Sequence, residues 1–172
     1  MRYPTARRWP VLVALQVLLA LPVHAEEFDQ LVAVVKKTWP DRKEVAMVCD
    51  TTASQPFVDD LRKVAGGSLK VKVYEVRGPG DIGRVIGQIT ATKTDLLVLV
   101  PSDPVAGDGL KEAEYLIKKL AASKIPTVAT TEIGVRQGAL IGVGPGTGGV
   151  VFVNAKAAGV VGLPLPPNGK GL

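Results

Sequence analysis

Residues 94–132 constrain the fold more than any other part of the chain. Residues 96–100 form an unbroken apolar run of the length expected for a strand covered on both faces. After a proline-containing loop, apolar residues recur at helical spacing from Leu110 to Leu120, and residues 125–129 form a second short apolar run. A helical crossover joins strands that lie parallel, so this segment predicts an α/β domain with a parallel sheet.

Two further strand–helix units precede this segment. Strands are predicted at residues 44–50 and 69–76, and the alternation of valine and lysine in the second places it near a sheet edge. Helices are predicted at residues 26–39, at 55–65 with Ser54 as N-cap, and from Asp81 to about residue 92. The fold class that follows is α/β, with a doubly wound, mostly parallel sheet in the flavodoxin-like order 2-1-3-4.

The strand–helix alternation ends after Glu132. Short apolar runs at residues 140–144 and 150–153 flank a glycine-rich turn and predict a C-terminal β-hairpin, and Asn154 starts a helix over residues 155–161. Residues 144–149 match G-x-G-x-x-G, but a dinucleotide site needs this turn to open a helix rather than a strand, so we expect no cofactor. Residues 164–172 are rich in proline and glycine and predict an extended or disordered tail.

The first 25 residues have the pattern of a signal peptide. Arginines at positions 2, 7 and 8 precede an almost wholly apolar run over residues 11–21, and small residues lead to Ala25. We expect cleavage after Ala25 and a location in the periplasm. Residues 26–163 then form a single α/β lobe, followed by the tail.

Removal of the signal peptide changes the net charge and the set of side chains available for catalysis. Three arginines leave, so the net charge of +5 becomes 5 − 3 = +2, which gives no support to nucleic-acid binding. His24 is the only histidine and leaves as well, and the single cysteine, Cys49, ends an apolar strand. We therefore expect no metal site and no enzyme. The alternative of acid–base catalysis by carboxylate pairs such as Asp50 with Asp103 has less support.

The polar loops of the predicted sheet form the candidate ligand site. Loops that leave the carboxyl ends of parallel strands gather at one edge, where helix N-termini also point. Hydroxyls and amides there could hold a carboxylate, and Asp103 or Glu132 could bind an amine. The alternative is that these residues only cap helices and form turns. The candidate ligand-binding residues are Asp50, Thr51, Ser54, Ser102, Asp103, Thr130, Thr131 and Glu132.

Several segments carry a resemblance to a known family. The sequences VPSD (100–103), KIPTVATTE (124–132), VRQGALIGVG (135–144) and FVNAKAAGVVGLPLP (152–166) resemble ABC-transporter substrate-binding proteins of the tryptophan- or tyrosine-binding type. The resemblance implies one lobe of a periplasmic-binding-protein-like fold, a small-molecule ligand and an ABC permease as partner. Such proteins have two lobes and are about twice as long, so a homodimer could supply the missing wall of the site.

A second resemblance leads to a different function. The size, the hairpin and the Asn-containing terminal helix are also similar to small periplasmic regulators that restrain an inner-membrane partner. The alternative function is therefore a regulatory or interaction module that docks on a membrane protein.

Overall fold

The computed structural model describes residues 23–143 and 149–172. Residues 1–22, with most of the expected signal peptide, and residues 144–148, with the turn of the expected hairpin, lie outside this part of the chain. Among the helices of the described ranges, none is both long and apolar enough to cross a membrane.

The described strands form one mixed sheet in the order β2-β1-β3-β4-β5-β6-β7. The predicted order 2-1-3-4 is confirmed, and all of these neighbours pair in parallel. β2 occupies one edge, as its alternating pattern predicts. The strands are β1 (Glu44–Cys49), β2 (Lys70–Glu75), β3 (Leu96–Leu99), β4 (Thr127–Ala129), β5 (Ile141–Gly142), β6 (Phe152–Val153) and β7 (Lys170–Gly171).

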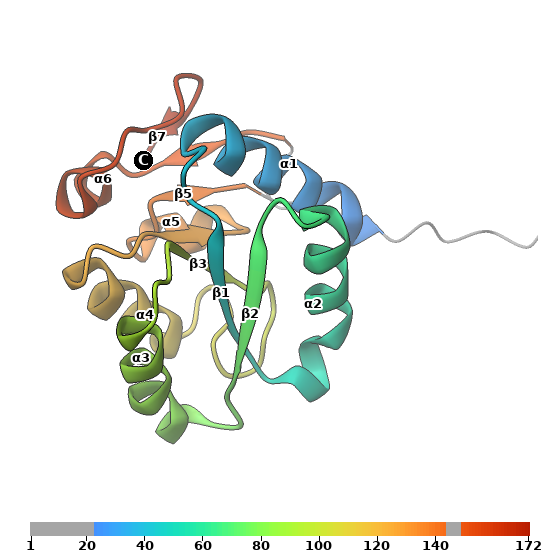
Figure 1. Cartoon of the computed structure of the whole chain (residues 1–172). Coiled ribbons are helices and arrows are strands. Elements are labelled where there is room, and N and C mark those ends of the chain that lie inside the picture. The colour runs from blue at the N-terminus through green and yellow to red at the C-terminus, as the bar shows by residue number, and fades with distance from the viewer. Residues whose placement is uncertain (1–22, 144–148) are drawn as a thin grey trace, which may run out of the picture.

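Helices cover both faces of the sheet. Figure 1 shows α1 and α2 on one side of β1 and β2, and α3 and α4 on the other side. The mixed α/β fold, with helices on both faces of a mostly parallel sheet, is therefore as predicted. The helices are α1 (Val23–Thr38), α2 (Thr51–Ala65), α3 (Ile82–Ala91), α4 (Lys111–Ala122), α5 (Glu132–Arg136) and α6 (Ala155–Val161), with a 3-10 turn η1 (Pro79–Asp81) before α3.

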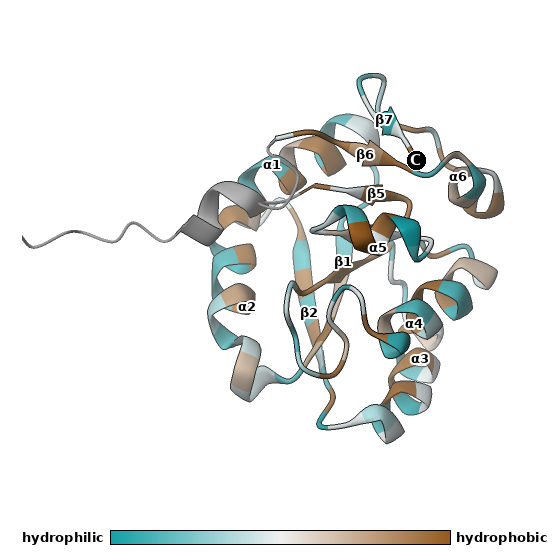
Figure 2. Cartoon of the chain, turned by 180° about the vertical axis from the view of Figure 1, so that it is seen from behind, coloured by the Kyte–Doolittle hydropathy of each residue, from teal (hydrophilic) through white to brown (hydrophobic). Residues whose placement is uncertain are grey.

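Two apolar cores lie on the two faces of the sheet. Met47 and Cys49 of β1 pack with α1 and α2, whereas Ala46 and Val48 pack with α3 and α4, because successive side chains of a strand point to opposite faces. In Figure 2 brown, apolar residues run along the strands and the inner sides of the helices, and teal residues gather outside. The continuous apolar runs of β1 and β3 thus follow from burial on both faces.

The predicted C-terminal hairpin pairing is confirmed, and the structure adds one strand, β7, that the sequence did not predict. β5 and β6 pair antiparallel, with Ile141 opposite Val153. The tail does not end as an isolated extension: β7 pairs in parallel with β6, and Nε1 of Trp39 donates a 2.9 Å hydrogen bond to the carbonyl of Pro164. A two-residue exposed strand has no apolar alternation, so no local pattern marked it.

Two predicted helix caps differ in the structure. α2 begins at Thr51 rather than after Ser54, because the Asp50 carboxylate accepts from the amide of Thr52 and caps the helix one turn earlier. Asp81 precedes α3 but makes no side-chain cap, since its carboxylate accepts from the amide of Arg77 and pairs with Arg84.

Candidate functional site

Asp103 connects two of the loops at the carboxyl edge of the sheet. Its Oδ2 accepts hydrogen bonds from the Ser54 hydroxyl at 2.6 Å and from the Asp50 amide at 2.8 Å. Its Oδ1 accepts from the amides of Val105 and Ala106 at 2.9 and 2.7 Å. Asp103 is only 3% exposed. The carboxylate thus fixes the loop after β3 to the start of α2, and its lone pairs are occupied within the protein.

The loop around Asp103 is tightly curled. A Cβ on Gly107 would lie 2.5 Å from the Asp103 carbonyl oxygen, so a glycine is needed for this close approach. Ser102 has a left-handed backbone with φ of 57° and is exposed. The Ser102 hydroxyl makes no hydrogen bond to any described residue and is available to a ligand.

Asp108 forms a second connection, at the end of β4. Its Oδ2 accepts from the Thr131 hydroxyl at 2.8 Å and from the amide and hydroxyl of Thr130, both at 3.2 Å. Its Oδ1 is buried and has no hydrogen-bond partner among the described residues. Burial raises the pKa of Asp108 above its ordinary value, and the hydrogen bonds from Thr131 and Thr130 partly oppose this shift.

Sequence reasoning did not include Asp108 among the candidate residues. Its position before α4 is typical of a helix cap, but the N-cap of α4 is Leu110, and Asp108 turns toward α5 instead. Gly134 makes room for it, because a Cβ there would lie 2.9 Å from Asp108 Oδ1 and 2.4 Å from the Ala129 Cβ. The partners of Asp108 are 22 and 23 residues away, so no local signal could identify them.

The eight predicted residues therefore fall into different environments at the same edge. Asp50, Ser54 and Asp103 form one hydrogen-bonded cluster, and Thr130 and Thr131 form another around Asp108. Glu132 begins α5 and pairs with Arg136, whose Nε lies 2.9 Å from Oε1. The predicted residues that keep solvent-exposed surface are Asp50, Thr51, Ser102, Thr131 and Glu132.

The described residues offer little catalytic chemistry at this edge. Cys49 is fully buried, and burial raises the pKa of its thiol to about 12, with the charges of Asp103 and Asp50 adding to the shift. Within residues 23–143 and 149–172 no group of three or more His, Cys, Asp or Glu side chains could hold a metal ion. The edge is thus an array of hydroxyls, amides and the partly exposed carboxylates of Asp50 and Glu132.

Comparison with solved structures finds this fold in three proteins at 16–19% identity. A conserved domain protein from Vibrio cholerae superposes with a TM-score of 0.72 at 16% identity, over 84% of this chain and 59% of that one. An ABC domain from Streptococcus pneumoniae in complex with L-Trp gives 0.66 at 18% identity, over 84% and 60%. A substrate-binding protein with adhesive properties from Clostridium difficile, in its ligand-free open form, gives 0.68 at 19% identity, over 82% and 58%.

These likenesses define the class of fold. The chain has a periplasmic-binding-protein-like fold, and the matched region spans less than two thirds of each of the three proteins. No known family model matches the sequence, and no curated protein matches it.

Proposed function

We propose that this chain is the solute-binding component of an ABC-type transport system. It would be exported to the periplasm through cleavage after Ala25 and would bind a small polar or carboxylate-bearing ligand at the carboxyl edge of the sheet. The observation that carries the proposal is the superposition, over more than four fifths of the chain, on two proteins described as an L-Trp complex of an ABC domain and a substrate-binding protein.

The chemistry of the edge suits such a ligand. The hydroxyls of Thr51 and Ser102 can donate to a carboxylate, and Glu132 can pair with an amine. The Thr131 hydroxyl already donates its proton to Asp108. Asp103 has no lone pair left for an amine, so its part in this proposal is to hold the Ser102 loop in place. The binding groups are thus fewer than the sequence suggested, but they sit on a rigid support.

A single lobe leaves a ligand open to solvent on one side. A second copy of the chain or another subunit, such as a permease, would supply the missing wall. Ile133, 56% exposed in the first turn of α5, lies beside the edge and offers an apolar contact for that partner. We propose that the protein is not an enzyme, because hydroxyls and amides bind a ligand without any acid–base or nucleophilic group.

Calorimetry tests this proposal. We would titrate the protein with L-tryptophan, L-tyrosine, L-glutamate and phenylpyruvate. We expect at least one to bind, and Ser102→Ala and Glu132→Gln each to weaken it about tenfold, the value of one hydrogen bond to a charged group. Ser123→Ala is the matched control, because Ser123 is exposed at the C-terminus of α4, near the start of β4 and so at the opposite edge of the sheet. Folded protein that binds none of these compounds, or edge variants that match the control, would refute the proposal.

One observation favours the alternative function, a regulatory or interaction module that docks on a membrane protein. The Asp103 carboxylate and Oδ2 of Asp108 accept hydrogen bonds from the protein's own loops, as expected for an edge whose polar groups serve the fold rather than a ligand. Ile133→Asp discriminates, because it charges the exposed apolar contact without touching Ser102. If it abolishes capture of a membrane partner while no compound binds, the alternative holds.

A further inference from the structure

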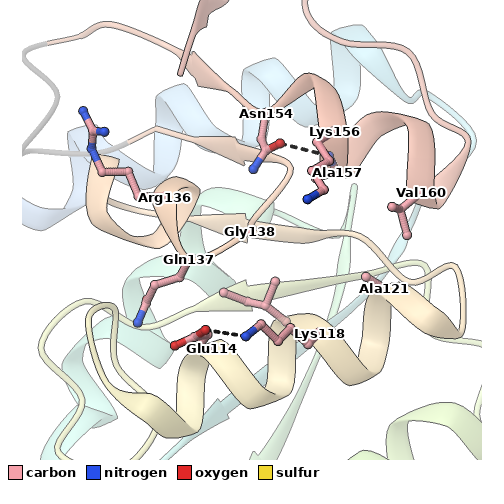
Figure 3. A pocket seen from close by; sticks show the side chains of 11 residues that line it. Glu114, Lys118, Ala121, Arg136, Gln137, Gly138, Asn154, Lys156, Ala157 and Val160 are labelled. Carbon is pink, nitrogen blue, oxygen red and sulfur yellow. Dashed lines mark hydrogen bonds and ion pairs between the residues drawn. The ribbon is translucent and has the colours of Figure 1, made fainter.

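A groove of about 400 Å³ lies between α4 and α6. Glu114, Ile117, Lys118 and Ala121 form one wall, at positions that share one side of α4. Figure 3 shows the opposite wall, formed by Asn154 and α6, with the segment after α5 closing one end. The volume lies within the range of small-molecule sites. None of the eight candidate residues of the carboxyl edge lines this groove.

The apolar part of the groove lining is held in place by packing. Ile117 and Ala157 are buried, and Val160 is 43% exposed beside them. Gly138 has a φ of +114°, and a Cβ there would lie 3.3 Å from Cγ2 of Ile117. This glycine lets the chain pass close to α4. The Nζ of Lys124 donates to the carbonyl of Val160 and ties the last turn of α6 to the end of α4.

Polar groups are held in defined positions at the wall formed by α6. Asn154 Oδ1 accepts from the amide of Ala157 at 2.9 Å, and Asn154 Nδ2 donates to the carbonyl of Val135 at 3.1 Å. An amide nitrogen carries two donors, so one N–H of Asn154 is left over. The side chain of Gln137 is fixed by two hydrogen bonds: its Oε1 accepts from the amide of Gly109, and its Nε2 donates to the carbonyl of Leu110.

The charges around the groove are unequal. Lys118 pairs with Glu114 at 2.5 Å, and Arg136 pairs with Glu132 and points away from the groove in Figure 3. Lys156 points from α6 toward α4 and has no ion pair or hydrogen bond with any residue of the described ranges. The lining thus carries the cations Lys118, Arg136 and Lys156 against the single carboxylate Glu114, and the ammonium of Lys156 is unpaired.

We propose that this groove binds a small carboxylate with an apolar body, separately from the carboxyl edge. The carboxylate pairs with the Lys156 ammonium and accepts from the remaining N–H of Asn154, and the apolar body lies on Ile117, Ala121 and Val160. A charge-assisted hydrogen bond beside an apolar surface is the combination that favours an amphipathic anion over a neutral compound of the same shape.

Titration of the ¹⁵N-labelled full chain by NMR tests this inference, with phenylacetate as the probe and phenylacetamide as its uncharged counterpart. We expect saturable shifts of the amides of Gly138, Ala157 and Val160 with phenylacetate, and binding of phenylacetamide that is at least about tenfold weaker. Lys156→Gln should weaken the binding of phenylacetate by about tenfold, because one charge-assisted hydrogen bond is lost.

Lys111→Gln is the matched control, since Lys111 is exposed on α4, outside the groove. Val160→Glu is a second variant, which adds a negative charge at an exposed position and should also weaken binding. Both lysine variants change exposed side chains and should keep the unfolding midpoint of the parent. Equal binding of the two probes, shifts confined to the carboxyl edge, or equal affinities of the Lys156→Gln and Lys111→Gln variants would overturn the inference.

Discussion

The hydroxyl of Ser54 donates to the carboxylate of Asp103 across 2.6 Å, and this bond joins the first turn of α2 to the loop after β3. The two residues are 49 positions apart and almost completely buried. Since the Asp50 amide shares the same oxygen, one carboxylate fixes the ends of β1 and β3 relative to each other. The shape of the carboxyl edge therefore depends on a buried charge and its donors.

Asp103→Ala should destabilise the protein by about 2–4 kcal/mol, because it leaves several buried donors without an acceptor. Chemical denaturation in urea measures the change. Asp59→Ala is the control: Asp59 is exposed and, among the described residues, accepts a hydrogen bond only from Gln55, so its loss should cost no more than about 0.5 kcal/mol. Equal stabilities of the two variants would show that the Asp103 hydrogen bonds contribute nothing.

Asp108 should make stability depend on pH. Burial raises the pKa of Asp108 in the folded protein above the ordinary 3.8, so the folded state binds the proton more tightly than the unfolded state. Its contribution to the free energy of unfolding is then fully present below pH 3.8 and decreases as the pH rises through the raised folded value. Subtracting the unfolding free energies of Asp108→Asn from those of the parent, across acidic pH, should give a difference that falls with pH. A difference that rises or stays level contradicts this.

Gly134→Ala should destabilise the protein by roughly 1–3 kcal/mol, as expected for overpacking. The added Cβ would lie 2.4 Å from the Cβ of Ala129 and 2.9 Å from Asp108 Oδ1. Gly83→Ala is the matched control, because Gly83 lies within α3 and a Cβ there meets nothing within 4 Å. That substitution should stabilise the protein by about 0.5–1 kcal/mol through helix propensity. Thermal unfolding should show a lower Tm for Gly134→Ala and a higher Tm for Gly83→Ala than for the parent protein. Tm changes of the same sign in both variants would contradict the packing argument.

Deletion of residues 164–172 should lower stability by about 1–3 kcal/mol and change the fluorescence of Trp39. The deletion removes the acceptor of the Trp39 Nε1 donor and the packing of Leu165 against the core. Deletion of residues 167–172 removes β7 but keeps Pro164 and Leu165, so it should cost less. The tail is consequently part of the lobe, and its removal alone does not distinguish a ligand receptor from an interaction module. Identical unfolding of both truncated proteins would contradict its structural role.

Most of the layered architecture could be predicted from the sequence. The apolar run of β3, the helical spacing in α4 and the alternation in β2 each reflect which faces of the element are buried. The pattern of apolar residues along the sequence therefore predicts these elements. Parallel pairing and right-handed crossovers then allow few strand orders, so the order 2-1-3-4 could be predicted.

For the candidate site, the sequence predicted the location at the carboxyl edge but not the contacts of its residues. Sequence reasoning placed Asp103 and Thr131 at the carboxyl edge but could not assign their partners, because the hydrogen bonds to Ser54 and Asp108 join residues 49 and 23 positions apart. It also left out Asp108, whose carboxylate turns away from the helix it precedes in the chain.

The sequence alone determined the alternation of strands and helices and the scarcity of catalytic side chains, because period and residue type are local properties. Tertiary structure alone decided which carboxylates are occupied by the protein itself, how the tail joins the sheet as β7, and where α4 and α6 leave a groove beside Lys156. Those outcomes depend on contacts between distant segments, whose geometry exists only once the whole core has packed.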